Sequence, residues 1–371
     1  MERNVTLDFV RGVAILGILL LNISAFGLPK AAYLNPAWSG SASLSDAWTW
    51  ALLDLLAQVK FLTLFALLFG AGLQLLLPRG KRWIQSRLTL LALLGFIHGL
   101  FFWDGDILLA YALVGLVSWR MVMLYLTGIA VLVLLGLISG TAANRSWAPD
   151  AANLQYEQYW KLHGGMEAVS NRADMLSDNL LALGAQYGWQ LAGMMLMGAA
   201  LMRSGWLKGQ FSLRHYRRTG ALLVAAGMAV NLPAIFAQWY LAWDYRWCAF
   251  LLQAPRELSA PLQAIGYAAL AWGYWPQLCR FRLVGAIACV GRMALTNYLL
   301  QTLICTTLFY HLGLFMRFDR LQLLAFVPPI WAVNLLVSSL WLRRFRQGPV
   351  EWLWRQLTLR EIGRASCRER V

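Results

Sequence analysis

Residues 7–24 read LDFVRGVAILGILLLNIS, an apolar stretch long enough to cross a membrane as one helix. It includes three polar side chains, Asp8, Arg11 and Asn22, which are costly in hydrocarbon. Asp8 and Arg11 are three residues apart and share a helical face, while Asn22 lies ~16 Å further along the same helix. Because polar groups at this depth commonly have a function, the stretch predicts both a membrane helix and part of a site.

The composition of the whole chain also indicates a membrane protein. Of 371 residues, 60% are hydrophobic and 13% are charged, and apolar runs of similar length recur along the chain. They predict an all-α fold, a polytopic membrane helix bundle of about ten transmembrane helices. The predicted spans are 8–28, 50–77, 88–103, 106–119, 121–139, 187–202, 219–239, 260–278, 284–309 and 323–342.

These spans divide the chain into four regions. Residues 1–139 and 187–360 are predicted to form two sets of membrane helices, each with about five members. Residues 140–186 are polar and predict an extracytoplasmic loop region, which either caps a cavity or is a solvated helix without contact to a site. Residues 361–371 lose the preceding amphipathic pattern and are predicted to be a non-native tail. The very short connection at Arg120 suggests a deletion.

The formal net charge is +15, and the basic residues gather in short clusters between the apolar spans. The positive-inside rule explains such clusters better than nucleic-acid binding does, so no nucleic-acid partner is expected. With the clusters in the cytoplasm, both termini are predicted to be cytoplasmic and the protein to contact membrane lipids. The first apolar stretch is predicted to be an uncleaved span, because Arg11 lies too far into it for a secretory signal.

Two patterns argue against a bound metal or nucleotide cofactor. The cysteines have no CxxC spacing, and four of them, Cys248, Cys279, Cys289 and Cys305, lie in apolar stretches and are predicted to be core thiols. Residues 69–72, FGAG, lack the strand–turn–helix context of a nucleotide-binding loop. They predict close helix packing instead.

The strongest candidate for a catalytic base is His98, within LLGFIHGLFFWDGD at residues 93–106. A buried histidine can act as a general base if a carboxylate orients it. Asp104 or Asp106 would do so if the WDGD turn folds back over the end of the helix. The alternative is a histidine that only makes a packing hydrogen bond in the core.

Further polar side chains at membrane depth are Lys60, Arg292, Asn297 and Gln301. Asn297 and Gln301 are four residues apart and share one helical face, with Arg292 about a turn and a half earlier. Such amides can bridge two helices or can donate hydrogen bonds to an oxyanion.

The beginning of the first span has two interpretations as well. Asp8 and Arg11 either form a local ion pair or recognise an anionic ligand, since a guanidinium group suits phosphate and carboxylate. Gly12, which follows, would allow another helix to approach closely.

Four segments resemble the bacterial inner-membrane YeiB family, which has no established function. They are residues 7–24, KFLTLFALLFGAG at 60–72, RLTLLALLGFIHGLFFWDGDILLAYALVG at 87–115, and GRMALTNYLLQT at 291–302. The resemblance extends from Met1 to about Arg360 and implies a multi-pass protein of the inner membrane.

More distantly, LDFVRG at residues 7–12, with a polar residue eleven positions after the arginine, is similar to the transmembrane acyltransferase superfamily. That resemblance implies a transmembrane acyltransferase-like fold, acyl-CoA as a co-substrate without a tightly bound cofactor, and an envelope glycan or lipid as acceptor. In one branch the catalytic histidine stands at the position of Asn22, and in another it lies in the loop that follows. Here residues 29–49 contain no histidine, which leaves His98 as the intramembrane candidate.

The resulting hypothesis is an inner-membrane protein that transfers an acyl group from cytoplasmic acyl-CoA to an envelope acceptor. His98 would deprotonate the acceptor, while Asn22 and Asn297 would stabilise the oxyanion. Two alternatives remain open: a small-solute transporter or permease, and a catalytically inactive relative that binds or scaffolds. The sequence leaves the oligomeric state undetermined. The ligand-binding candidates are Asp8, Arg11, Lys60, Arg292, Asn297 and Gln301, and the catalytic candidates are His98, Asp104, Asp106 and Asn22.

Overall fold

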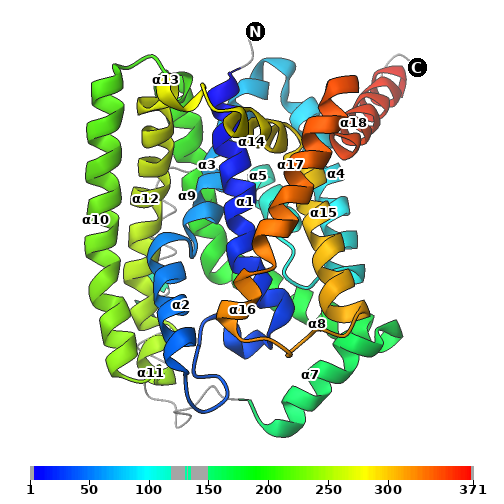
Figure 1. Cartoon of the computed structure of the whole chain (residues 1–371). Coiled ribbons are helices and arrows are strands. Elements are labelled where there is room, and N and C mark those ends of the chain that lie inside the picture. Colours follow the sequence, from blue (N-terminus) through cyan, green and yellow to red (C-terminus); the bar gives the residue numbers. More distant parts are fainter. Residues whose placement is uncertain (1–3, 118–129, 132, 135–148, 369–371) are drawn as a thin grey trace.

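A computed structural model of the chain describes residues 4–117, 130–131, 133–134 and 149–368 (Figure 1). Every regular element in these ranges is a helix, which confirms the all-α prediction. The connection at Arg120, where a deletion was inferred, lies outside the described residues. The main helices are α1 (Val5–Gly27), α2 (Leu44–Leu56), α3 (Lys60–Leu76), α4 (Lys81–Phe101), α5 (Leu108–Val117), α7 (Ala151–His163), α8 (Gly165–Ala182), α9 (Gly188–Arg203), α10 (Leu213–Tyr240), α11 (Tyr245–Cys248), α12 (Ala254–Gly273), α13 (Trp275–Leu278), α14 (Arg282–Arg292), α15 (Ala294–Thr306), α16 (Arg320–Leu324), α17 (Val327–Arg344) and α18 (Pro349–Arg368).

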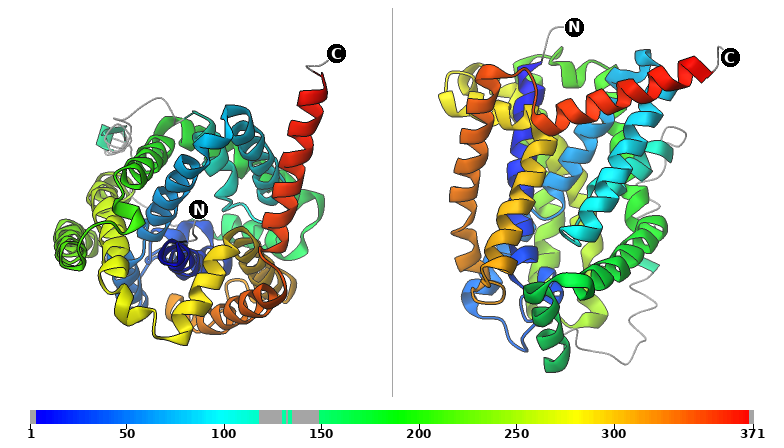
Figure 2. Two further views of the ribbon diagram at one scale, coloured as in Figure 1. Left: turned by 90° about the horizontal axis from the view of Figure 1, so that it is seen from above. Right: turned by 90° about the vertical axis from the view of Figure 1, so that its right-hand side faces the viewer.

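Helix α1 is the axis of the bundle, and the other helices surround it in the left-hand view of Figure 2. In its most apolar window 72% of the residues are buried, against 28–39% for the other candidate membrane spans. A helix that is apolar on all sides and buried on all sides needs neighbours around its whole circumference. The first apolar stretch is therefore the innermost element of the fold.

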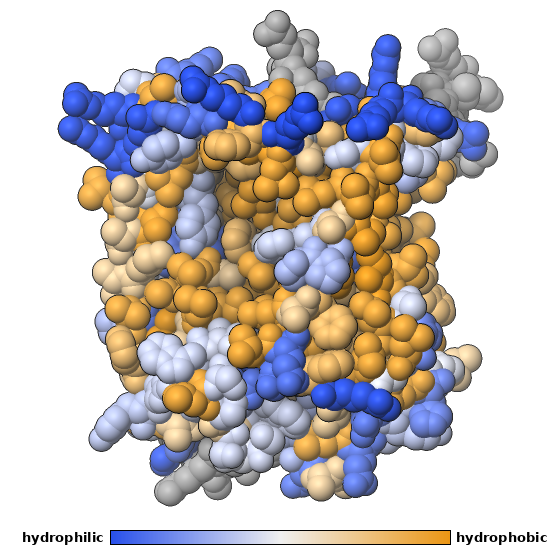
Figure 3. Space-filling view, in the orientation of Figure 1, coloured by the Kyte–Doolittle hydropathy of each residue, from blue (hydrophilic) through white to orange (hydrophobic). Residues whose placement is uncertain are grey.

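Five segments of the described chain are long and apolar enough to cross a membrane, and α14 with α15 would make a sixth if this pair, bent by 90°, forms one span. The prediction of about ten spans is thus not confirmed. Figure 3 shows an apolar belt between two polar ends. We call the end where α1 begins and α18 lies the basic face, because Lys81 at the start of α4 and Arg343 and Arg344 in the last turn of α17 lie there, and the opposite end the α7–α8 face. The five segments are Val5–Gly27, Leu44–Arg79, Lys81–Phe101, Leu213–Tyr240 and Arg320–Arg344.

The predicted close approach at Gly12 is confirmed. A Cβ atom at Gly12 would lie 2.1 Å from the carbonyl oxygen of Ile287 in α14. Reciprocally, a Cβ atom at Gly291 would lie 1.8 Å from the carbonyl oxygen of Asp8. The backbones of α1 and α14 therefore touch, which only glycine permits at these two positions.

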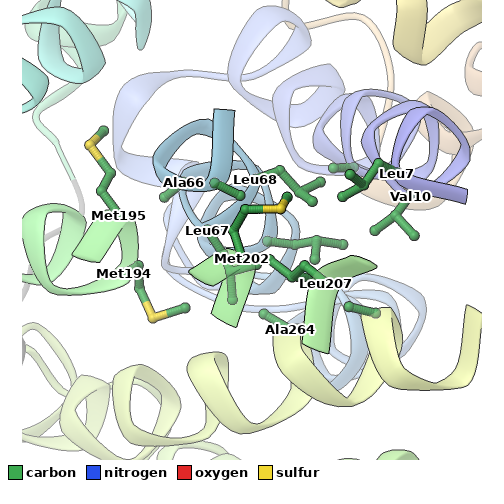
Figure 4. Packing of buried hydrophobic residues seen from close by; sticks show 14 of the residues in the cluster. Leu7, Val10, Ala66, Leu67, Leu68, Met194, Met195, Met202, Leu207 and Ala264 are labelled. Atoms are coloured by element: carbon green, nitrogen blue, oxygen red, sulfur yellow. The ribbon is translucent and has the colours of Figure 1, made fainter. Parts of the chain in front are cut away.

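The FGAG motif also packs as predicted. A Cβ atom at Gly70 of α3 would lie 1.9 Å from the carbonyl oxygen of Met195 in α9, and one at Gly198 would lie 1.8 Å from that of Leu67. Figure 4 shows apolar side chains of both helices in this part of the core, with Leu67 of α3 beside Met202 of α9. The motif serves helix packing between α3 and α9.

Candidate active site

The structure places the predicted base and one predicted carboxylate in direct contact. Nδ1 of His98, in the last turn of α4, lies 2.8 Å from Oδ1 of Asp106. Oδ2 of Asp106 accepts a hydrogen bond of 2.9 Å from the backbone N–H of Leu109, in the first turn of α5. The WDGD turn therefore folds back over the end of α4, and Asp106 rather than Asp104 is the residue that orients the imidazole.

The other ring nitrogen of His98 has a different environment. His98 is 3% exposed, and its Nε2 has no hydrogen-bond partner among the described residues. Because the carboxylate of Asp106 accepts a hydrogen bond from Nδ1–H, the neutral ring carries its proton on Nδ1 and a free lone pair on Nε2. An oriented imidazole with a free Nε2 is the arrangement of a general base in acyl-transfer enzymes.

Tyr298 of α15 completes this cluster and was missed by the sequence analysis. Its ring centroid lies 5.4 Å from that of His98, and its hydroxyl accepts a 3.3 Å hydrogen bond from the backbone N–H of Ile107. The side chain is 2% exposed. A signal existed, since Tyr298 directly follows Asn297 in a quoted motif, but a tyrosine in an apolar helix is normally a packing residue.

A cavity of about 350 Å³ extends from the basic face to Tyr298, while His98 and Asp106 lie behind Tyr298 and do not line it. Most of its walls are apolar side chains of α3, α4 and α5. Arg11, Arg87 and Arg292 line its basic-face part, while Tyr298 and Ile107 line its deep part. The cavity thus has three guanidinium groups at one end and Tyr298, the ring neighbour of His98, at the other, an arrangement suited to a long ligand with an anionic head.

The arginines of the cavity also contact the protein. Nη1 of Arg11 lies 3.2 Å from Oδ1 of Asp8, so the predicted local ion pair exists, although the Arg11 side chain remains 30% exposed. Arg292 donates a 2.9 Å hydrogen bond to the carbonyl of Arg346. The guanidinium group of Arg87 lies 3.5 Å from the ring centroid of Trp354 in α18. Arg87 and Trp354 were not among the predicted residues.

The amides of α15 form a separate network. Nδ2 of Asn297 donates to Oγ of Ser338 at 2.7 Å and to the carbonyl of Met293 at 2.9 Å, and its Oδ1 accepts from Asn334 at 2.8 Å. Nε2 of Gln301 lies 3.3 Å from Oδ1 of Asn334. These bonds connect α15 to α17, which favours the helix-bridging interpretation over the oxyanion one.

The remaining predicted residues lie away from the cavity. Lys60 is fully buried at the start of α3, where it donates to the backbone carbonyl of Asp54. Asn22 is half-buried in α1 and is not part of the cavity lining. The backbone carbonyl of Asp104 accepts a 3.1 Å hydrogen bond from Asn179 of α8.

Helix α8, which lies in the polar region predicted at residues 140–186, covers the site from the α7–α8 face. Besides the bond from Asn179, Arg172 of α8 donates a 3.1 Å hydrogen bond to the carbonyl of Phe101 at the end of α4. A Cβ atom at Gly99 would lie 3.4 Å from Leu176. Helix α8 is therefore packed on the end of α4 and is not a free solvated helix.

The cysteines differ in exposure. Cys248 and Cys305 are buried, as predicted for core thiols, whereas Cys279 is exposed and Cys289 is half-buried. Cys279 follows α13 on the basic face, where the chain turns between two helices (Figure 1). Its apolar sequence context therefore did not indicate burial.

Comparisons with known proteins identify relatives along nearly the whole chain. Residues 201–361 match a family described as protein of unknown function (DUF418). The chain is 76% identical to uncharacterized protein YeiB of Escherichia coli strain K12, over 98% of both chains. It is 30% identical to uncharacterized protein YxaH of Bacillus subtilis strain 168, over 96% of this chain and 94% of that protein. No solved structure matches.

Proposed function

The chain belongs to the YeiB family, and we propose that it is an acyltransferase of the bacterial inner membrane, which moves an acyl group from cytoplasmic acyl-CoA to an envelope acceptor. The observation that carries the proposal is the cavity, which extends from three arginines on the basic face to Tyr298, whose ring centroid lies 5.4 Å from that of His98. The apolar belt and the five long apolar segments of the described chain support a membrane location.

The proposed orientation follows from charge. Basic residues are retained on the cytoplasmic side of membrane proteins, so the basic face, with both termini, would face the cytoplasm. The cavity would then be open to the compartment that contains acyl-CoA. Arg11, Arg87 and Arg292 would bind the phosphates, because guanidinium groups form charge-assisted, bidentate contacts with such oxygens. The apolar walls would hold the pantetheine arm and the acyl chain.

The proposed chemistry is direct transfer through His98. Nε2 takes the proton of the acceptor hydroxyl or amine while that oxygen or nitrogen attacks the thioester carbonyl carbon. Asp106 stabilises the imidazolium that forms. The carbon–sulfur bond of the tetrahedral intermediate then breaks, and the CoA thiolate recovers the proton from Nε2.

The negative oxygen of that intermediate requires a hydrogen-bond donor. The hydroxyl of Tyr298 accepts from Ile107, which leaves its own proton free to be donated to an oxygen in the cavity. Tyr298 therefore replaces Asn297 in the proposal, because the amide hydrogens of Asn297 are committed to α15 and α17. Asn22, the other predicted donor, does not line the cavity and has no role in the proposal.

Binding of the donor can be tested without knowledge of the acceptor. A ligand that binds the folded state raises the melting temperature of detergent-purified protein, so we expect acyl-CoA and CoA to do so. Arg11→Ala should weaken CoA roughly 10- to 100-fold, the range for one charge-assisted contact. Arg214→Ala, which changes an exposed arginine at the start of α10, is the matched control.

The catalytic role requires a separate readout. His98→Gln should retain the CoA-dependent shift in melting temperature but lose thioester cleavage. No shift with any CoA species, in protein shown to be folded, would refute the acyltransferase proposal and favour the transporter.

A further inference from the structure

The apolar segment Leu44–Arg79 is not one continuous helix, because it breaks between α2 and α3 at residues 57–59. Val59 has a φ of 67°, a left-handed conformation that is costly for a β-branched residue. The break leaves carbonyl groups at the end of α2 without helical partners. They accept instead from side chains: the buried Lys60 and Asn231 donate to the carbonyl of Asp54, and the half-buried Tyr267 donates to that of Leu56 at 2.8 Å.

Four ionisable side chains surround this break, and we call Asp54, Lys60, Arg256 and Glu257 the charge cluster. Their exposed fractions are 1%, 0%, 4% and 8%. Nη1 of Arg256 lies 3.8 Å from Oδ2 of Asp54, and its Nη2 lies 3.7 Å from Oε1 of Glu257. Both distances are too long for hydrogen bonds, and polar groups separated in this way are commonly bridged by water.

A small polar chamber adjoins the cluster on the side of the α7–α8 face. Its polar lining residues are Ser24, Tyr33, Asp54, Gln58 and Arg320, and its volume is about 10 Å³. That volume is close to the minimum for a single water molecule. Larger ligands do not fit.

Two buried polar atoms at this chamber accept or donate no hydrogen bond within the described residues. Oδ2 of Asp54 and Oγ of Ser24, which is 3% exposed, have no hydrogen-bond partner in the described part of the chain. Buried polar atoms are normally satisfied by protein or by ordered water. An anion would be repelled by Asp54 and a cation by Arg320, whereas water can donate to the carboxylate and to the hydroxyl.

We propose that one ordered water occupies this chamber, hydrogen-bonded to Asp54 and Ser24, and that through it the charge cluster exchanges protons with the α7–α8 face. The proposed orientation places that face outside the cytoplasm. The water donates one of its protons to Oδ2 of Asp54 while it accepts another proton from the side of the α7–α8 face. An O–H bond forms on Asp54, one O–H bond of the water breaks and another forms, and a neutral water molecule remains. Charged side chains from three helices face Asp54: Lys60 of α3, Arg256 and Glu257 of α12, and Arg320 of α16. The other polar neighbours are uncharged, namely Tyr33, Ser24 of α1 and Asn231 of α10.

Protonation would have a mechanical consequence at the break. A neutral Asp54 no longer attracts the guanidinium group of Arg256, so one attraction between α2 and α12 is lost. Lys60 would keep its hydrogen bond to the backbone carbonyl of Asp54, because that bond does not depend on the carboxylate. This inference is independent of the acyltransferase proposal, since none of these residues lines the large cavity.

The water can be detected by radiolytic hydroxyl-radical footprinting of the whole protein in lipid nanodiscs. Trp50 lines the chamber and Trp272 lies in the apolar core, yet both are 4% exposed. We expect Trp50 to be oxidised several times faster than Trp272, because radicals form at bound water. Ser24→Val, which fills the chamber, should lower the rate of Trp50 to that of Trp272. Equal rates for the two tryptophans in the wild type would exclude the water.

The proton-exchange role can be tested by infrared difference spectroscopy between acidic and neutral pH. We expect a carbonyl stretch of a protonated, buried carboxylic acid that disappears in Asp54→Asn and shifts in Asp54→Glu. Asp174→Asn, which changes an exposed carboxylate of α8, should leave the band unchanged. A wild-type spectrum without such a band would overturn the proposal even if neither Asp54 variant folds, as would a band that persists in a folded Asp54→Asn protein.

Discussion

Replacing Asp106 with asparagine should change both the stability of the site and the protonation pattern of His98. The carboxylate accepts two hydrogen bonds, from Nδ1–H of His98 at 2.8 Å and from the backbone N–H of Leu109 at 2.9 Å. Bonds to a charged group contribute about 1.5–3 kcal/mol and neutral ones about 0.5–1.5 kcal/mol, so each bond should weaken by ~1 kcal/mol. The sum, ~2 kcal/mol, corresponds to a roughly 30-fold change in the unfolding equilibrium.

The chemical effect of Asp106→Asn should be larger than its effect on stability. The amide can keep the bond from Leu109 through its oxygen, but its NH₂ group then faces Nδ1 and donates to it. The imidazole proton moves to Nε2, and the free lone pair of the proposed base is lost. We expect acyl transfer to fall by roughly 10²–10⁴-fold, the range for loss of general base catalysis.

Nitrogen NMR of protein labelled at histidine measures the tautomer directly. The chain has four histidines, so the signals can be assigned by single substitutions. The wild type should show His98 protonated at Nδ1, and Asp106→Asn should show it protonated at Nε2. Asp104→Asn is the matched control, because the carbonyl rather than the side chain of Asp104 holds Asn179. An unchanged tautomer in Asp106→Asn, or the same change in Asp104→Asn, would refute this account of the site.

Two further substitutions test the fold, and the labelling of two cysteines tests the orientation and the burial of the thiols. Gly291→Ala should destabilise the protein by about 2 kcal/mol or more, because the new Cβ meets backbone and not a movable side chain, whereas Gly285→Ala meets nothing within 4 Å and should be neutral or slightly stabilising in a thermal unfolding assay. Glu351→Gln should lower the melting temperature by weakening bonds from the backbone N–H groups of Leu295 and Thr296, a loss of about 1 kcal/mol that the exposed Glu361→Gln should not reproduce. A membrane-impermeant maleimide should label Cys279, in a Cys367→Ser background, in inverted vesicles but not in intact cells, and labelling from the outside would reverse the proposed orientation. Cys248 should stay unlabelled at pH 8, because it is fully buried and burial raises the pKa of its thiol to about 12, so the reactive thiolate is scarce below that pH.

The sequence predicted the type of fold and part of the site, for identifiable physical reasons. Hydropathy shows which segments avoid water, so α1 and the other segments long and apolar enough to cross a membrane were recognised, whereas the predicted number of about ten spans is not confirmed. The pairing of His98 with a carboxylate was anticipated because Asp106 follows His98 by only eight positions in the sequence. The choice of Asp106 over Asp104 was not, since it depends on how the turn folds over α4.

Helix breaks and distant partners were missed. The spans predicted at 50–77 and 284–309 are each broken, one at Val59 and one by 90° at Met293, and neither residue is a proline or glycine. The chain stays apolar through both breaks, so the hydropathy of the sequence does not reveal where the helices end. Tyr298 reaches Ile107 across 191 positions of sequence, and such a contact is created only by packing of the whole bundle.

The central position of α1 has a consequence for how the protein is made. Helix α1 is synthesised first, but the partner for its Gly12, the α14 backbone around Ile287 and Gly291, is synthesised about 280 residues later. At ~5–20 residues per second, that interval is roughly 14–56 s. In the proposed membrane location, α1 stays in the bilayer without α14 during this time, and Asp8, three residues before Arg11, neutralises the charge of Arg11. The ion pair between Asp8 and Arg11 thus lowers the cost of keeping α1 in lipid until the helices that surround it have been inserted.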